Sequence, residues 1–103
     1  MALMTVIYRK PEDPEAFDEH YFATHVPLAK KLPGLRRYEV SRGPVTVPVG
    51  DFEVHFVATM QFDDLAAIRS ALASPEGQAA AADRRQLAAD DAVLILLCET
   101  REV

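Results

Sequence analysis

Four short segments of the chain have the apolar patterns that are typical of β-strands. Residues 3–8 are apolar, contain β-branched and aromatic side chains, and end at a polar, proline-containing stretch. Residues 35–42 alternate between apolar and polar positions, and residues 53–62 do so more clearly, with Phe56 and its second neighbours on one face. Residues 92–98 are apolar without interruption, which indicates a strand that is covered on both faces.

A helical period follows the first predicted strand. Between residues 15 and 32, one stripe of apolar and aromatic positions is about 100° wide at 3.6 residues per turn. Acidic residues near the start and lysines near the end complement the helix dipole, and a Pro-Gly pair stops the helix. Because Pro27 lies inside it and cannot donate a backbone hydrogen bond, we expect a kink there but no end. The stripe comprises Phe17, Tyr21, Thr24, His25, Leu28 and Leu32.

Two further helices are expected between the third and the fourth strand. Asp63 is a suitable N-cap, and residues 65–72 follow it with apolar positions at helical spacing. Ser74 is a second cap, and Pro75 at the first helical position opens another helix that runs to about Leu87.

The order of elements is therefore strand, helix, strand, strand, broken helix, strand. This order is typical of the α+β, ferredoxin-like split βαβ fold, in which one antiparallel sheet carries both helices on one face. The other face would expose Val57 together with half of the apolar run at 93–98. A second copy of the sheet is the simplest cover, so we expect a homodimer.

Composition narrows the classes of function. The 103 residues are 50% hydrophobic and 26% charged, which is typical of one compact domain spanning residues 1–103. A net charge of −5 disfavours nucleic acid as a partner. The longest apolar run is too short to span a membrane and no leader peptide is recognisable, so we expect a cytoplasmic protein without a membrane partner. Cys98 is the only cysteine, and inside an apolar run we expect it to be a small core residue.

Several motifs together resemble the EthD-like family of the dimeric α+β barrel superfamily. They are Thr5-Val6-Ile7-Tyr8, the His-Tyr pair at 20–21 followed after three residues by His25-Val26-Pro27-Leu28, Pro-Gly-Leu at 33–35, and Ser-Pro-Glu-Gly at 74–77. The resemblance spans nearly the whole chain. It implies a homodimer with a ligand cleft between sheet and helices, in a family associated with catabolic or biosynthetic gene clusters. Related barrels include cofactor-independent isomerases, polyketide cyclases and monooxygenases.

His25 is the candidate catalytic residue. It lies on the sheet-facing side of the first helix, one turn from Tyr21, so we expect its imidazole at the cleft. A histidine near pH 7 gives or takes a proton, and an apolar surround with a tyrosine partner suits a general acid or base. A core histidine bonded to backbone is the alternative, and the resemblance, whose motif includes this position, favours the catalytic role. We expect the substrate to be bound by Tyr21, Tyr8 and Tyr38.

The other histidines are expected to have structural roles. His20 lies five residues before His25, about 140° around a regular helix, so the two cannot chelate one metal ion. His55 lies on the strand face opposite Phe56, toward the expected dimer interface, where packing is favoured over ligation. No spacing implies a metal, and no phosphate loop or dinucleotide fingerprint implies a nucleotide cofactor. The basic residues, which helix ends and solvent account for, are Lys30, Lys31, Arg36, Arg37 and Arg42.

Three functions remain open from the sequence. The first is a cofactor-independent enzyme for a small, largely apolar, oxygenated or aromatic compound, in which His25 moves a proton and Tyr21 hydrogen-bonds a carbonyl or hydroxyl. The second is a non-catalytic module that binds such a compound, or a partner enzyme of the same pathway, through the same cleft. The third and weakest is haem binding through His25 as an axial ligand, since related barrels handle haem.

Overall fold

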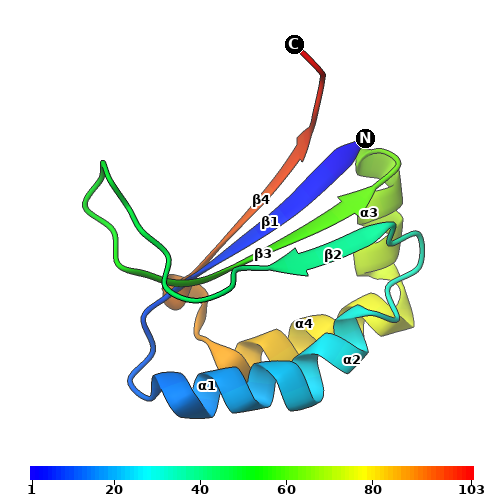
Figure 1. The fold of residues 1–103 in the computed structure, drawn as a ribbon. Helices are drawn as coiled ribbons and strands as arrows, with labels where there is room; N and C mark the ends of the chain where they lie inside the picture. Colours follow the sequence, from blue (N-terminus) through cyan, green and yellow to red (C-terminus); the bar gives the residue numbers. More distant parts are fainter.

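The computed structural model describes residues 1–103 as an antiparallel sheet with its long helices packed on one face (Figure 1). The strands lie in the order β2-β3-β1-β4, which confirms the predicted ferredoxin-like fold. No helix has the length and the apolar stretch that a membrane span requires. The strand bounds are Ala2–Arg9 for β1, Arg37–Val40 for β2, Val54–Phe62 for β3 and Val93–Glu99 for β4.

The helices lie close to their predicted positions. Ser74 caps α4 as predicted, because its hydroxyl oxygen accepts a hydrogen bond from the amide of Gly77 at 3.0 Å. The bounds are Pro14–His20 for α1, Tyr21–His25 for η1, Val26–Ala29 for α2, Leu65–Ala73 for α3, Pro75–Leu87 for α4 and Asp90–Ala92 for the short helix η2.

The cap of α3 is Asp64, and the prediction of Asp63 is wrong. The carboxylate of Asp64 accepts a hydrogen bond from the amide of Ala67 at 2.7 Å. Asp63 instead forms an ion pair with Arg36, at 2.9 Å between a guanidinium nitrogen and a carboxylate oxygen. Two consecutive aspartates are equally good caps by residue type, so the sequence does not separate them.

The first helix continues through Pro27, as predicted, but it contains a π-helical turn, η1. The amide of Val26 bonds to the carbonyl of Tyr21, five residues back, where an α-helix would use the fourth. In a regular α-helix the Pro27 ring would press against the carbonyl of Ala23. The wide turn lies immediately before this proline, so the expected irregularity takes the form of a π turn.

The π turn changes which side chains face the sheet. Thr24, which belongs to the predicted stripe, is exposed, and Ala29, which does not, is buried. The helix also ends at Ala29, before the predicted limit at residue 32. A stripe drawn at a constant 3.6 residues per turn does not hold across a widened turn. The side chains that are buried in α1, η1 and α2 are Phe17, Tyr21, His25 and Ala29.

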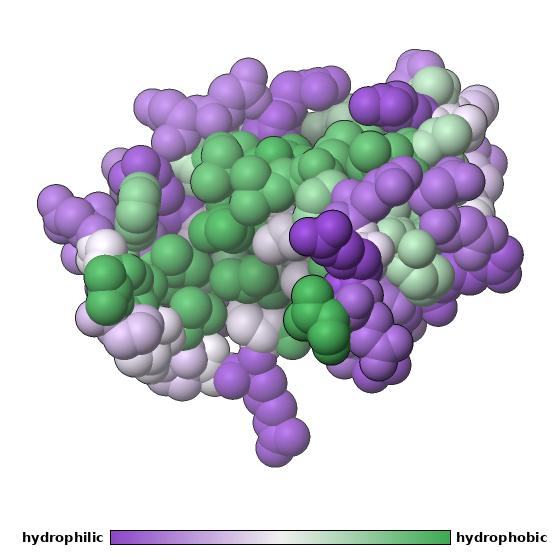
Figure 2. Space-filling view, turned by 90° about the horizontal axis from the view of Figure 1, so that it is seen from above, coloured by the Kyte–Doolittle hydropathy of each residue, from purple (hydrophilic) through white to green (hydrophobic).

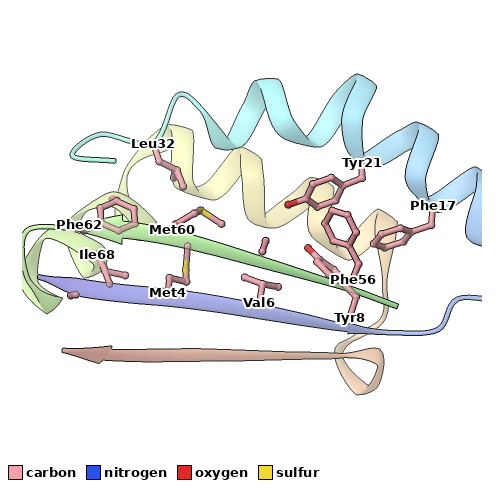
Figure 3. Packing of buried hydrophobic residues seen from close by; sticks show 13 residues of the cluster. Met4, Val6, Tyr8, Phe17, Tyr21, Leu32, Phe56, Met60, Phe62 and Ile68 are labelled. Carbon is pink, nitrogen blue, oxygen red and sulfur yellow. The ribbon is translucent and has the colours of Figure 1, made fainter. Parts of the chain in front are cut away.

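The core lies between the helices and the facing side of β1 and β3 (Figure 3). An aromatic cluster fills one end, where the ring centroids of Tyr21 and Phe56 are 4.5 Å apart and those of Tyr8 and Phe17 are 5.1 Å apart. Phe62 and aliphatic and sulfur-containing side chains fill the rest of the layer. The cluster therefore holds the two tyrosines rigidly between sheet and helix.

A β-bulge in β3 reorients His55. Two neighbouring pairs of the β1–β3 ladder enclose this residue, which has no partner of its own on β1. Its ring lies edge-on to Phe17, with centroids 5.3 Å apart, and its Nε2 is 2.7 Å from Oδ1 of Asp18 on α1. The prediction that His55 points toward the dimer side is wrong, because strict alternation does not hold across a bulge. Its contacts are those of a packing residue.

The edge strand β4 leaves apolar side chains uncovered in the single chain. Leu94 and Leu96, on the face away from the helices, are 54% and 46% exposed. Figure 2 shows apolar side chains gathered over this face of the molecule. Cys98 is also exposed, so its prediction as a core residue is wrong for the single chain. The reason is that Cys98 pairs with Leu3 on the face that the helices leave uncovered.

We expect Gly77→Ala to destabilise the chain. A Cβ at Gly77 would lie 2.1 Å from the carbonyl oxygen of Ala71 at the end of α3. Helix propensity alone would make the substitution stabilising by about 1 kcal/mol, so a net loss isolates the clash. Urea denaturation should show a free energy of unfolding lower by about 2 kcal/mol or more. Ala82→Ser, exposed on the same helix, is the control, and equal stability of Gly77→Ala and wild type would contradict the contact.

Candidate functional site

A cavity of about 250 Å³ lies between the sheet and the helices. Its lining is mostly apolar and comes from β1, β3, β4 and the helical layer. The polar groups in its wall belong to Tyr8, Tyr21, His25 and Arg84. Three of the sequence-predicted site residues, one of them the catalytic candidate, are therefore brought to a single cavity.

His25 is positioned by the π turn and held by an acidic residue of α4. Its side chain is buried, with 5% of the residue exposed, and its Nδ1 lies 2.9 Å from Oδ2 of Asp83. The other carboxylate oxygen of Asp83 lies 2.8 Å from Nε2 of His20, whose side chain is 37% exposed. One carboxylate therefore holds two histidines of the first helix.

This arrangement corrects the expected separation of the two histidines. On a regular helix, residues five apart point in different directions. In a π turn, the backbone hydrogen bond joins residues i and i+5, so His20 and His25 come onto the same side. Sequence reasoning correctly expected His20 to be partly exposed and structural, but it missed the carboxylate that both rings share.

Charge and burial decide the protonation of this group. Burial acts to raise the pKa of Asp83, but the hydrogen bonds from His20 and His25 outweigh it and keep that pKa below its ordinary value. Burial lowers the pKa of His25 below 6.5, and the hydrogen bond to Asp83 offsets only part of that effect. At neutral pH the carboxylate is charged and the His25 ring is neutral.

The His25 ring lines the cavity, whereas Asp83, the partner of its Nδ1, is not part of the cavity wall. A carboxylate can only accept, so Nδ1 of the neutral ring carries the proton that it donates to Asp83. Nε2 then carries a lone pair. Nε2 has no hydrogen-bond partner in the chain. Every fully buried side-chain nitrogen or oxygen has a partner, so Nε2 must be partly accessible.

The three candidate tyrosines divide into two environments. Tyr8 and Tyr21 are almost fully buried and line the cavity. The hydroxyl of Tyr21 is hydrogen-bonded to that of Tyr38, at 2.5 Å between the oxygens. Tyr38 itself is not part of the cavity wall. Burial raises the pKa of all three phenols, so each is a neutral hydroxyl at physiological pH.

Arg84 adds a positive charge to the cavity wall. Its side chain is 14% exposed and is held by the carbonyl of Ala88, at 2.8 Å, and by Asp90, at 2.7 Å. Sequence reasoning missed both Arg84 and its neighbour Asp83. The sequence does contain a pattern that places Arg84 on the cavity side of α4. One helix face, with the spacing i, i+3, i+4, i+7, is formed by Gly77, Ala80, Ala81 and Arg84.

The remaining basic residues lie outside this cavity. Arg36 is paired with Asp63, and Arg37 with Glu39. Arg42 and the His55–Asp18 pair lie along a separate, open groove between α1 and the loop that joins β2 to β3. That groove contains none of the predicted catalytic or substrate-binding residues.

The fold and cavity define a class: a ferredoxin-like α+β domain with a buried histidine between sheet and helices. The family model of the EthD domain matches residues 9–91. An uncharacterized 11.0 kDa protein from the thcB-thcC intergenic region of Rhodococcus erythropolis is 34% identical over 99 residues, which cover 96% of this chain and 95% of that protein. An ethyl tert-butyl ether D (EthD) family protein of Bacillus halodurans is 36% identical, with a TM-score of 0.87 over 98% of this chain and 99% of that chain. This chain belongs to the EthD family.

More distant solved structures share the fold alone. SnoaB, a cofactor-independent oxygenase from Streptomyces nogalater, is 22% identical, with a TM-score of 0.68 over 99% of this chain and 94% of that chain. Two others, from Jannaschia sp. and Thermobifida fusca, are described as dimeric ferredoxin-like proteins of unknown function, each with a TM-score of 0.69.

The lowered pKa of His25 predicts how stability depends on pH. Its folded-state pKa lies below the ordinary value of 6.5, so the unfolded chain takes up this proton first. The stability that the neutral His25 ring contributes is fully present above pH 6.5 and is lost as the pH falls below this value. The carboxylate of Asp83 titrates at a much lower pH, so the two effects do not overlap. We expect the melting temperature to fall between pH 7 and pH 5, and less steeply in His25→Gln. His55→Gln, in a histidine–aspartate pair outside the cavity, is the control. Parallel profiles for all three proteins would contradict the lowered pKa.

Proposed function

We propose that this chain is a cofactor-independent enzyme that moves a proton on a small, largely apolar, oxygenated or aromatic compound bound in the His25 cavity. The observation that carries the proposal is the buried imidazole of His25, which lines that cavity, is neutral at pH 7 and has no hydrogen-bond partner at Nε2. The reaction classes that fit are isomerisation, cyclisation and oxygenation. The description of SnoaB as a cofactor-independent oxygenase supports the last class through the shared fold.

In the proposed step, Nε2 of His25 takes a proton from an acidic C–H or O–H of the ligand. The electron pair of that bond stays on the ligand as an enolate or phenolate. The carboxylate of Asp83 stabilises the resulting imidazolium through Nδ1, and the charge of Arg84 favours the anion. The hydroxyls of Tyr8 and Tyr21 orient the oxygen of the ligand. Return of the proton to another atom completes an isomerisation.

Two alternatives are separated by measurement. A module that binds the same compound without turnover would use the same cavity. Haem binding through His25 is disfavoured by size, because about 250 Å³ is below the roughly 300–1,000 Å³ of sites for drug-sized ligands, and haem is larger still.

We expect His25→Gln to lose proton transfer while remaining folded. A panel of small ketones, enols and phenols is incubated with the protein in deuterium oxide, and NMR follows exchange of the acidic C–H. The wild type should accelerate exchange for at least one compound, and His25→Gln should slow it by about 10²- to 10⁴-fold. Gln can still donate to Asp83, so the stability loss should stay near 1 kcal/mol.

Stability and binding data separate the outcomes of that experiment. A loss of about 2–4 kcal/mol in His25→Gln, with no compound bound by wild type, would identify a core histidine and refute the proposal. Compounds that bind at the cavity without exchange would identify the binding module. His55→Gln serves as the control and should exchange like the wild type.

We also propose that the chain is a homodimer joined through the sheet face that the helices leave uncovered. By the alternation of β4, Leu94 and Leu96 lie on this face beside Thr5 and Ile7 of β1. Exposed apolar side chains that lie side by side on a sheet face are typical of an interaction surface. The dimeric ferredoxin-like proteins of the same fold support this arrangement.

Light scattering should give about twice the chain mass of 11.4 kDa at micromolar concentration. Leu96→Lys places a charge on the uncovered face and should shift the protein to the monomer. Ala82→Lys, exposed on α4, adds the same charge on the helix side and should leave the mass unchanged. A wild-type monomer would refute the dimer.

A further inference from the structure

We propose that Asp83 acts as a specificity-determining residue that makes the cavity select hydroxylated ligands, phenols and enols, over ethers of the same shape. This inference rests on the proposed function, since it takes the His25 cavity as the ligand site. It adds the class of compound that the site accepts and the residue that decides it. The deciding residue touches no ligand and acts through the tautomer of His25.

The tautomer follows from the sharing of one carboxylate by two rings. His20 and His25 approach different oxygens of Asp83, at 2.8 and 2.9 Å. A carboxylate offers only lone pairs, so each ring must present an N–H to it. For His25 this fixes the proton on Nδ1 and leaves Nε2 as an acceptor. A ligand atom beside Nε2 must therefore be a donor, and an ether or carbonyl oxygen there would face a lone pair.

Tyr8 is the second polar group in the cavity without a partner. Only 1% of the residue is exposed, its hydroxyl makes no hydrogen bond within the chain, and it lines the same cavity as His25. The hydroxyl of Tyr21, by contrast, is hydrogen-bonded to that of Tyr38. A ligand hydroxyl is both donor and acceptor, so it can donate to His25 and accept from Tyr8. The two free groups of the wall together complement one O–H.

The volume indicates the size of the hydroxylated compound. An apolar cavity of about 150 Å³ is enough for benzene. The cavity of about 250 Å³ therefore suits roughly one substituted ring or two fused rings. This makes 2-naphthol a suitable probe, with 2-methoxynaphthalene as its match without the O–H.

Calorimetry with both probes tests the selection. The wild type should bind 2-naphthol about tenfold more tightly than 2-methoxynaphthalene, because the ether leaves Nε2 without a donor. In Asp83→Asn the amide can donate to Nδ1, which allows the proton to move to Nε2. The preference for the naphthol should then fall to about twofold or reverse. Asp18→Asn, which alters the histidine–aspartate pair outside the cavity, should keep the wild-type preference.

A spectroscopic arm reads the tautomer without any ligand. Long-range ¹H–¹⁵N spectra of the wild type should show His25 neutral and protonated at Nδ1, and those of Asp83→Asn should show a shift toward Nε2. Equal affinity of the wild type for both probes would overturn the selection and leave the ligand site of the proposed function intact. A wild-type ring protonated at Nε2 would overturn the role of Asp83. Failure of all naphthalene probes to bind would overturn the proposed selection of hydroxylated ligands. Because the wild type supplies both readouts, misfolding of Asp83→Asn would not remove the test.

Discussion

The hydrogen bonds from His20 and His25 to the single carboxylate of Asp83 are the interaction on which the site depends. They join α1 and η1 to α4 and fix the orientation of the His25 ring, which lines the cavity. Removing either histidine would leave the carboxylate with one partner. Removing the carboxylate would release both rings at once.

The cavity combines few polar groups with a largely apolar wall. In such surroundings a hydrogen bond that is left unmade costs more than in water, so the two unpartnered groups, Nε2 of His25 and the hydroxyl of Tyr8, exert strong selection on what enters. The tyrosine pair formed by Tyr21 and Tyr38 adds rigidity from β2. The EthD fold thus supplies a rigid frame, and the proposed chemistry would rest on a handful of side chains within it.

The fold was predictable from the sequence because alternation and helical periodicity are local properties. The positions of the strands and helices followed from them, as did the sheet-facing side of His25 and Tyr21, and the order of elements then indicated the fold. Two backbone irregularities were not predictable, since a π turn and a β-bulge each insert one residue into a regular period without a clear residue signature. They account for the errors at Thr24 and His55. Asp83 was missed because its partners lie some sixty positions away, on another helix.

The π turn makes chain length, and not only residue identity, a determinant of the site. A π turn is one residue longer than the α-helical turn that it replaces, so η1 corresponds to a single insertion in an α-helix. Deleting one residue from 21–25 would restore the regular helix and rotate α1 by about 100° relative to α2. His20 would leave Asp83 and Phe17 would leave the core, although every one of those side chains would still be present. A change of length by one codon is therefore sufficient to separate the paired histidines.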